Sequence, residues 1–164
     1  MDLLRGPIRI EIVEPDALAA CRILRAYIDD VASTYYGRAA TQEEIDVALR
    51  DDPSDDLAPP NGIFLIARQD DIVLGCAGLR LLPDGVAEMR RLFVTSAARG
   101  RGLGSQLMGE LEHLARTHGR SVLRLDTRHD LVEARRLYAA LGYDEVPAFN
   151  DGRYAEHWFA KSLA

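Results

Sequence analysis

The sequence predicts a mixed α/β fold in which a mostly antiparallel central sheet of about seven strands is flanked by four helices. Two patterns support this prediction. Residues 63–94 form three short apolar or alternating segments separated by turn-type residues, which is typical of consecutive antiparallel strands. Residues 15–33 and 103–118 instead repeat apolar side chains at the spacing of a helix.

The N-terminal third predicts one strand and two helices. Residues 7–14 alternate apolar and polar side chains, as a half-buried first strand should, and residues 15–33 follow as the first helix. Thr41 and Glu44 have the spacing of a capping box and start the second helix. Residues 51–62, DDPSDDLAPPNG, show no periodicity and are expected to form a surface loop.

The remainder predicts three strands, then a helix, a strand, a helix and two strands. The sequences QDD and PDG separate the first three strands as hairpin turns, while Gly119 and Gly142 end the two helices. The expected order is therefore βααβββαβαββ. Its last eight segments are 63–68, 72–82, 86–94, 103–118, 121–127, 131–141, 143–149 and 153–163.

The composition is that of one soluble globular domain covering residues 1–164, with 48% apolar and 28% charged residues. No apolar run is long enough to span a bilayer, and the start lacks a signal-peptide pattern, so we expect a cytoplasmic protein with no membrane partner. Cys21 and Cys76 are expected to be buried core thiols, and a single disulfide between them is the alternative. The net charge of −6 argues against nucleic acid as the main partner.

The stretch RGRGLG, residues 99–104, joins a predicted strand to a predicted helix. A helix N-terminus leaves backbone N–H groups unpaired and carries a partial positive charge, so it favours anions. Glycines would let a bulky phosphate approach those groups, and Arg99 and Arg101 add positive charge. The Walker and dinucleotide-binding patterns do not fit, whereas R-x-x-G-x-G fits at Arg99, Gly102 and Gly104.

The segment AEMRRLFVTSAARGRGLGSQLMGELEHLA resembles the acetyl-coenzyme A binding segment of the GNAT superfamily of N-acetyltransferases. EARRLYAALGYDEV is similar to the second motif of that family, and the expected element order is also the family's order. The resemblance covers about residues 8–163 and is strongest over 86–146. It departs at Leu131, where the family often has an asparagine near the pantetheine arm.

The resemblance implies acetyl-CoA as co-substrate, with its pyrophosphate held by the backbone of the glycine turn and its pantetheine arm along the preceding strand. The residues implied for this binding are Phe93, Val94, Arg99, Gly100, Arg101, Gly102, Leu103, Gly104 and Ser105.

The resemblance also implies two catalytic residues. Tyr138 matches the general acid that protonates the departing thiolate, and the alternative is a core aromatic side chain. Glu88 lies on the strand where many members carry the general base, and the alternative is an ion pair with Arg90 or Arg124. His129 and His157 are alternative bases. No His, Cys or Asp cluster has metal-ligand spacing, so no metal is expected.

The acceptor of the family usually lies across the sheet from the coenzyme. The residues expected to line its site are Tyr35, Tyr36, Phe149, Tyr154, His157 and Trp158. Aromatic side chains near acidic ones would suit a cationic amine, and simple packing is the alternative. Small amines, amino acids, aminoglycoside-like compounds and peptide N-termini all remain possible acceptors.

The sequence therefore predicts an N-acetyltransferase in which a primary amine of a small molecule or peptide attacks the thioester directly. The alternative is a non-catalytic acyl-CoA sensor or interaction module on the same fold. Dimers are frequent in the family, so a homodimer is possible, but no segment of the sequence predicts an interface.

Overall fold

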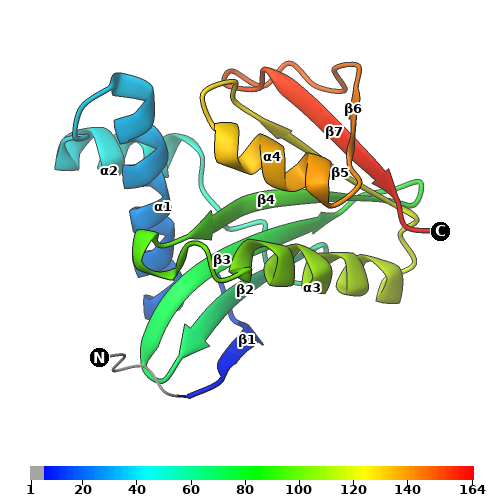
Figure 1. Cartoon of the computed structure of the whole chain (residues 1–164), viewed down its shortest axis with the longest axis horizontal. Coiled ribbons are helices and arrows are strands. Elements are labelled where there is room, and N and C mark those ends of the chain that lie inside the picture. The colour runs from blue at the N-terminus through cyan, green and yellow to red at the C-terminus, as the bar shows by residue number, and fades with distance from the viewer. Residues whose placement is uncertain (1–5) are drawn as a thin grey trace.

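The computed structural model describes residues 6–164 and confirms the expected order of elements. Figure 1 shows one twisted sheet with helices on both faces. The elements are β1 (Ile8–Ile12), α1 (Leu18–Tyr36), α2 (Gln42–Asp51), β2 (Gly62–Gln69), β3 (Ile72–Leu81), β4 (Val86–Val94), the 3₁₀ turn η1 (Ser96–Ala98), α3 (Leu103–Thr117), β5 (Val122–Thr127), α4 (Val132–Ala140), β6 (Asp144–Val146) and β7 (His157–Ser162).

The seven strands form a single sheet in the order β1-β2-β3-β4-β5-β7-β6. Neighbouring strands are antiparallel except β4 and β5, which are parallel. The expectation of a mostly antiparallel sheet is confirmed. Within the described residues, no helix combines the length and apolar character that crossing a bilayer requires.

Two apolar cores lie on opposite faces of the sheet because the strand side chains alternate. Leu65 of β2 joins the larger core, which contains Leu107 and Leu111 of α3 and extends to α4. Phe64, its neighbour, joins the smaller core under α1. Both strand residues are almost fully buried, so β2 is covered on both faces.

Local signals place several helix ends where the sequence predicts them. The capping box of α2 is present, with the Glu44 N–H donating to Thr41 Oγ1 at 3.1 Å and the Thr41 N–H donating to Glu44 Oε1 at 2.9 Å. Beyond α3, Gly119 adopts a φ of +75°, and the Arg120 N–H donates to the Ala115 carbonyl at 2.9 Å. This closure satisfies carbonyls of the last turn.

The strand expected over 153–163 is shorter in the structure, where β7 comprises His157–Ser162. Residues 147–156 instead make local turns, in which the Gly152 N–H donates to Asn150 Oδ1 and the Ala155 N–H donates to the Gly152 carbonyl. Hydrogen bonds used within turns are not available for a strand ladder.

The expectation for the two cysteines is half wrong. Cys76 is buried in β3, and burial raises the pKa of its thiol. Cys21 is exposed on α1, where its thiol contacts the carbonyls of Pro15 and Asp16. The apolar stripe of α1 buries Ala20, Ile23 and Leu24 but leaves this position to solvent.

The loop between α2 and β2 has no regular structure, as expected, but one of its residues belongs to the core. Leu57 is 1% exposed and packs into the core under α1. A Cβ at Gly78 would lie 2.5 Å from Leu57 Cδ1, so glycine in β3 makes room for this side chain. The acidic loop is therefore anchored to the sheet.

The parallel strands β4 and β5 separate after only three residue pairs. Their register ends at Glu88 and Arg124, although β4 continues to Val94 beside β3 and β5 continues to Thr127 beside β7. We call the unpaired part, Met89–Val94 facing Leu125–Thr127, the β4–β5 split. It leaves main-chain polar groups in the middle of the sheet without a strand partner.

A bulge in β4 accompanies this split. The β3–β4 register shifts between Cys76 and Gly78, and Arg91 on the opposite strand has a φ of +59°. A non-glycine residue in the left-handed region costs of the order of 1–2 kcal/mol. Contacts of the Arg91 side chain offset this cost, because its guanidinium donates to the Asp52 carbonyl at 2.8 Å and to Ser54 Oγ at 3.2 Å.

Candidate active site

The turn between η1 and α3 presents a run of free main-chain donors. Gly100 and Gly102 have φ values of +79° and +76°, a conformation that favours glycine. Arg99 donates its N–H to Ser96, and the helical pattern resumes when Gln106 donates to Gly102. Within residues 6–164, none of the six N–H groups from Gly100 to Ser105 has a hydrogen-bond acceptor. The turn can therefore bind an anion through its backbone.

The three glycines of the turn are required for different structural reasons. Nothing lies within 4 Å of a Cβ built at Gly100 or Gly102, so these two provide backbone conformation and open space. A Cβ at Gly104 would lie 3.1 Å from Leu137 Cδ2. Gly104 therefore also allows the start of α3 to pack closely against α4.

The two arginines of the turn contact the surrounding elements. Arg99 donates from Nε to the Val94 carbonyl at 3.2 Å and pairs with Asp30 of α1 at 3.4 Å. Arg101 donates to Gln69 Oε1 of β2 at 3.0 Å. Both residues are exposed, so they remain next to the turn as positive charges while helping to fix its position.

Phe93 and Val94 lie at the open end of the β4–β5 split. Phe93 pairs with Cys76 of β3, and its ring packs 5.9 Å from the ring of Tyr27 in α1. The glycine turn follows directly in the chain. An extended ligand with its anionic group on the turn could thus run along this end of β4 and use its unpaired edge.

Tyr138 of α4 is almost completely buried at 3% exposure. Its ring packs against Phe159 at 5.8 Å and Tyr143 at 6.3 Å. Burial raises the pKa of Tyr138, and the charges of Tyr27, Tyr143 and Asp126 raise it further. The phenol therefore remains protonated at neutral pH.

Glu88 is buried beside three arginines at the closed end of the split. Its carboxylate lies 3.2 Å from Arg124 Nε, 3.5 Å from Arg80 Nη1 and 3.9 Å from Arg90 Nη1. The ion-pair alternative from the sequence is therefore present with both expected arginines and with a third. Protonating Glu88 would weaken all three interactions.

The two histidines come together at the end of β5. His129 Nδ1 lies 2.9 Å from His157 Nε2, and the rings stack with centroids 5.2 Å apart. His157 Nδ1 contacts the carboxylate of Glu145 in β6. Because a carboxylate accepts, a neutral His157 carries its proton on Nδ1 and accepts from His129 on Nε2. This assignment leaves His129 Nε2 as a free proton acceptor.

The expected acceptor-lining residues divide into two groups. The first joins the end of α1 to the β6–β7 loop, with Tyr35 stacked edge-on against Tyr36 at 5.5 Å and Tyr154 at 5.6 Å. The second lies on β7 and in the same loop: the Trp158 indole donates to Asn150 at 3.0 Å, and Phe149 contacts Arg124. His157 belongs to the histidine pair.

One of the protein's own arginines lies over one face of each of four of these aromatic rings. Guanidinium carbons lie 4.2–5.3 Å from the ring centroids, in the pairs Arg124–Phe149, Arg38–Tyr36, Arg128–Tyr35 and Arg153–Tyr154. The expectation that aromatic rings would attract a cationic amine is therefore weakened, because these faces already have cations.

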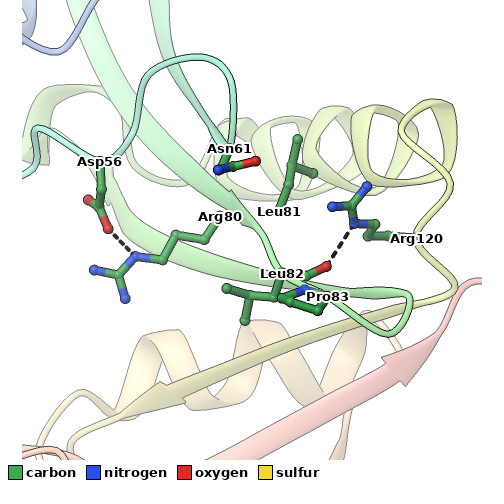
Figure 2. A pocket seen from close by; sticks show the side chains of 7 residues that line it. All are labelled: Asp56, Asn61, Arg80, Leu81, Leu82, Pro83 and Arg120. Carbon is green, nitrogen blue, oxygen red and sulfur yellow. Dashed lines mark hydrogen bonds and ion pairs between the residues drawn. The ribbon is translucent and has the colours of Figure 1, made fainter.

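The cavity in Figure 2 lies at the opposite end of β4 from the glycine turn, and one of its lining residues, Arg80, also pairs with Glu88. It has a volume of about 380 Å³ and includes Arg80, which is directed at Asp56, and Arg120, which donates to the Leu82 carbonyl. It borders the β3–β4 hairpin, whereas the glycine turn follows the other end of β4. A nine-residue strand separates the two by roughly 25–30 Å. Its full lining is Asp56, Asn61, Arg80, Leu81, Leu82, Pro83 and Arg120.

Sequence reasoning missed three features of this region. The first is Arg91 at the bulge, and the second is Tyr27, whose ring lies against the Arg91 guanidinium. The third is the contact between His129 and His157, which are 28 positions apart. No local sequence pattern predicts these features. A glycine or asparagine at position 91 would have indicated a left-handed residue and so a bulge, but the residue is arginine. Among residues 6–164, no group of three or more His, Cys, Asp or Glu side chains is arranged to hold a metal ion.

Comparison with known proteins connects this geometry to a family. Residues 24–143 match the model of the acetyltransferase (GNAT) family. An uncharacterized N-acetyltransferase of Schizosaccharomyces pombe is 34% identical over 110 residues, which cover 66% of this chain and 67% of that protein. The aminoalkylphosphonate N-acetyltransferase of Salmonella typhimurium is 28% identical, over 79% of this chain and 89% of its own length.

Some relatives are longer. The human N-acetylaspartate synthetase is 30% identical over 119 residues, and the match spans 39% of its length. Among solved structures, the PaiA N-acetyltransferase of Thermoplasma acidophilum in complex with coenzyme A has the same fold, with a TM-score of 0.75, 20% identity, and coverage of 95% of this chain and 99% of that one. The family match covers most of the chain and includes both the glycine turn and Tyr138, so this protein is a member of the acetyltransferase (GNAT) family and an acyltransferase.

Proposed function

We propose that this protein transfers the acetyl group of acetyl-CoA to a primary amine by direct attack within a ternary complex. The observation that carries this proposal is the run of six free N–H groups from Gly100 to Ser105, located where β4 ends beside the β4–β5 split. Family membership supports acetyl transfer, and the coenzyme A complex of the Thermoplasma relative supports the donor.

The turn would hold the pyrophosphate of the donor, and Arg99 and Arg101 would contribute long-range attraction. The pantetheine arm would follow the free edge of β4 near Phe93 and Val94, where its amide groups can replace the missing strand partner. This route brings the thioester into the split, beside Tyr138.

Tyr138 is suited to protonate the leaving thiolate as the C–S bond breaks. In water a phenol with a pKa of about 10 is a weaker acid than a thiol with a pKa of about 8.5, which makes the transfer unfavourable by about 2 kcal/mol. Burial raises the pKa of Tyr138, and it would equally destabilise a thiolate formed in the same place. The proton transfer is therefore useful only as the bond breaks.

The proton lost by the attacking amine needs an acceptor. Glu88 was the expected base, but both of its oxygens already contact guanidinium groups. His129 Nε2 is free, and the His129 ring is connected through His157 to the carboxylate of Glu145. His129 follows β5 at the open end of the split, opposite the end of β4. We therefore favour His129 as the base, with Glu88 holding the arginines in place.

A thiol-release assay with acetyl-CoA and a panel of primary amines tests the function. Direct attack predicts that coenzyme A is released continuously when an amine is present. Without an amine, the protein should not release even one equivalent of coenzyme A per protein chain. The Cys21→Ser variant is the control, because it removes the exposed thiol that could react with the assay reagent or carry an acetyl group. A stoichiometric burst without amine would contradict direct attack.

The Gly102→Glu variant tests the coenzyme site. A carboxylate on the turn should repel the pyrophosphate and lower coenzyme A affinity by about 100-fold, as measured by calorimetry. Gly119→Glu is a matched control, since Gly119 has nearly the same φ of +75° and equally open space at the other end of α3. Equal loss in both variants would attribute the effect to backbone strain.

The Tyr138→Phe variant tests the general acid. Loss of the hydroxyl should lower kcat by about 10²-fold or more and leave the KM for acetyl-CoA nearly unchanged. Tyr143→Phe is the control within the same aromatic cluster, because the Tyr143 hydroxyl is buried without a hydrogen-bond partner in the described structure. Wild-type turnover in Tyr138→Phe would remove this residue from the reaction.

Comparison of His129→Asn with Glu88→Gln tests the base. We expect the larger fall in kcat, about 10²-fold, in His129→Asn, and partial recovery when free imidazole is added. Imidazole can replace a lost proton acceptor but cannot repair a folding defect. The opposite ranking, without recovery by imidazole, would assign the proton to Glu88.

A further inference from the structure

Arg124 occupies a distinctive place in the sheet. Together with Glu88 it forms the last pair of the parallel ladder, so it lies at the closed end of the β4–β5 split. Its side chain is on the same face as Glu88, and Nε donates to Glu88 Oε2 at 3.2 Å. The guanidinium carbon lies 4.2 Å from the ring centroid of Phe149, and the side chain is 29% exposed.

The terminal nitrogens of Arg124 are unused. Within residues 6–164, neither Nη1 nor Nη2 has a hydrogen-bond acceptor. Nearby arginines differ: Arg90 and Arg91 donate from Nη2 to Asp52, and Arg128 donates from Nη2 to Asp130 and the Val31 carbonyl. Arg80 pairs with Asp56 as well as Glu88. Arg124 has only a carboxylate that it shares with two other arginines.

This arrangement has the geometry of an oxyanion receptor. Glu88 accepts a hydrogen bond from Nε and Phe149 lies over one face, so the guanidinium group is oriented before a ligand arrives. The other edge presents parallel N–H donors, which match the two oxygens of a carboxylate or the oxygens of a phosphonate. A guanidinium group held in this way loses little side-chain entropy on binding.

The position of Arg124 relative to the reacting centre sets the size of the ligand. Asp126 lies two residues further along the same face of β5, inside the β4–β5 split, and its carboxylate accepts a hydrogen bond from Asn150 at 2.9 Å. Residues i and i+2 of a strand are about 6–7 Å apart. An acid group on Arg124 and an amine beside Asp126 would therefore be separated by a distance found within a small amino acid or aminoalkyl acid.

We infer that the acceptor is a small primary amine that carries an acidic group, and that Arg124 binds this group through its free guanidinium edge. The inference rests on the proposed function and adds the substrate class. It also gives Glu88 and Phe149 a positioning role toward Arg124. A carboxylate and a phosphonate have the same chemistry toward this edge, so both are included in the test.

Matched pairs of amines in the thiol-release assay test this inference. β-Alanine is compared with propylamine, 2-aminoethylphosphonate with ethylamine, and putrescine represents a cationic acceptor. The wild-type protein should show kcat/KM values about 10- to 100-fold higher for the better acid-bearing amine than for its neutral partner, the size expected of charged hydrogen bonds. Putrescine should be the poorest substrate.

Arg124→Gln should reduce this ratio to about 1 while the KM for acetyl-CoA stays near the wild-type value. Arg124→Lys retains the charge without the paired donors, so it should keep an intermediate preference. Arg80→Gln is the matched control: it also removes a guanidinium group from Glu88, and the preference for the acid should persist. The unchanged coenzyme KM and a wild-type thermal midpoint show that the variants are folded.

The outcomes separate the inference from the proposed function. A wild-type preference for neutral or cationic amines, or an acid preference that survives in Arg124→Gln, overturns the inference and leaves acetyl transfer intact. Release with none of the amines, although coenzyme A binds, overturns the proposed function and the inference together. A preference that disappears equally in Arg80→Gln assigns the effect to Glu88 and overturns the role of Arg124.

Discussion

The early end of the ladder between β4 and β5 is the constraint on which the candidate site depends. Two parallel strands that remained paired would fill the centre of the sheet and leave no room for a ligand. Here pairing stops at Glu88 and Arg124, and β4 carries its bulge at Arg91 in the unpaired part. Contacts from the α1 side support each strand separately: Asp52 and Ser54 hold Arg91, and the Val31 carbonyl accepts from Arg128.

The electrostatics of the site follow from this geometry. Glu88 is buried where three arginines converge, and its charge is compensated only while they remain close. Two of these arginines have further acidic partners in the loop before β2, which limits the positive charge at the closed end of the split. The chain can therefore have an overall charge of −6 and still present a guanidinium edge inside.

Much of the fold was predictable because its signals are local. Period-two apolar segments, the capping box at Thr41 and the glycines that end α3 and α4 each act within a few residues, and the element order followed from them. The glycine turn was predictable for the same reason. Cys21 was misjudged because the apolar residues beside it in the sequence are on another face of α1.

The interior of the site was less predictable because its contacts join distant segments. Arg124 is 36 residues from Glu88, and His129 is 28 residues from His157. The sequence suggested the Glu88–Arg124 pair only as an alternative, and it gave no sign that the two histidines would meet. The register between strands and the position of a bulge determine such contacts, and no local sequence pattern predicts either of them.

Leu57 anchors its loop to the sheet, whereas the acidic residues of the same loop contact the arginines. One apolar side chain, seated over Gly78, anchors the segment that carries Asp52 and Asp56 to the arginines. The acidic positions themselves face solvent and carry no core packing. Exchange of these acidic side chains would therefore change the charge beside Glu88 without removing the apolar anchor of the loop.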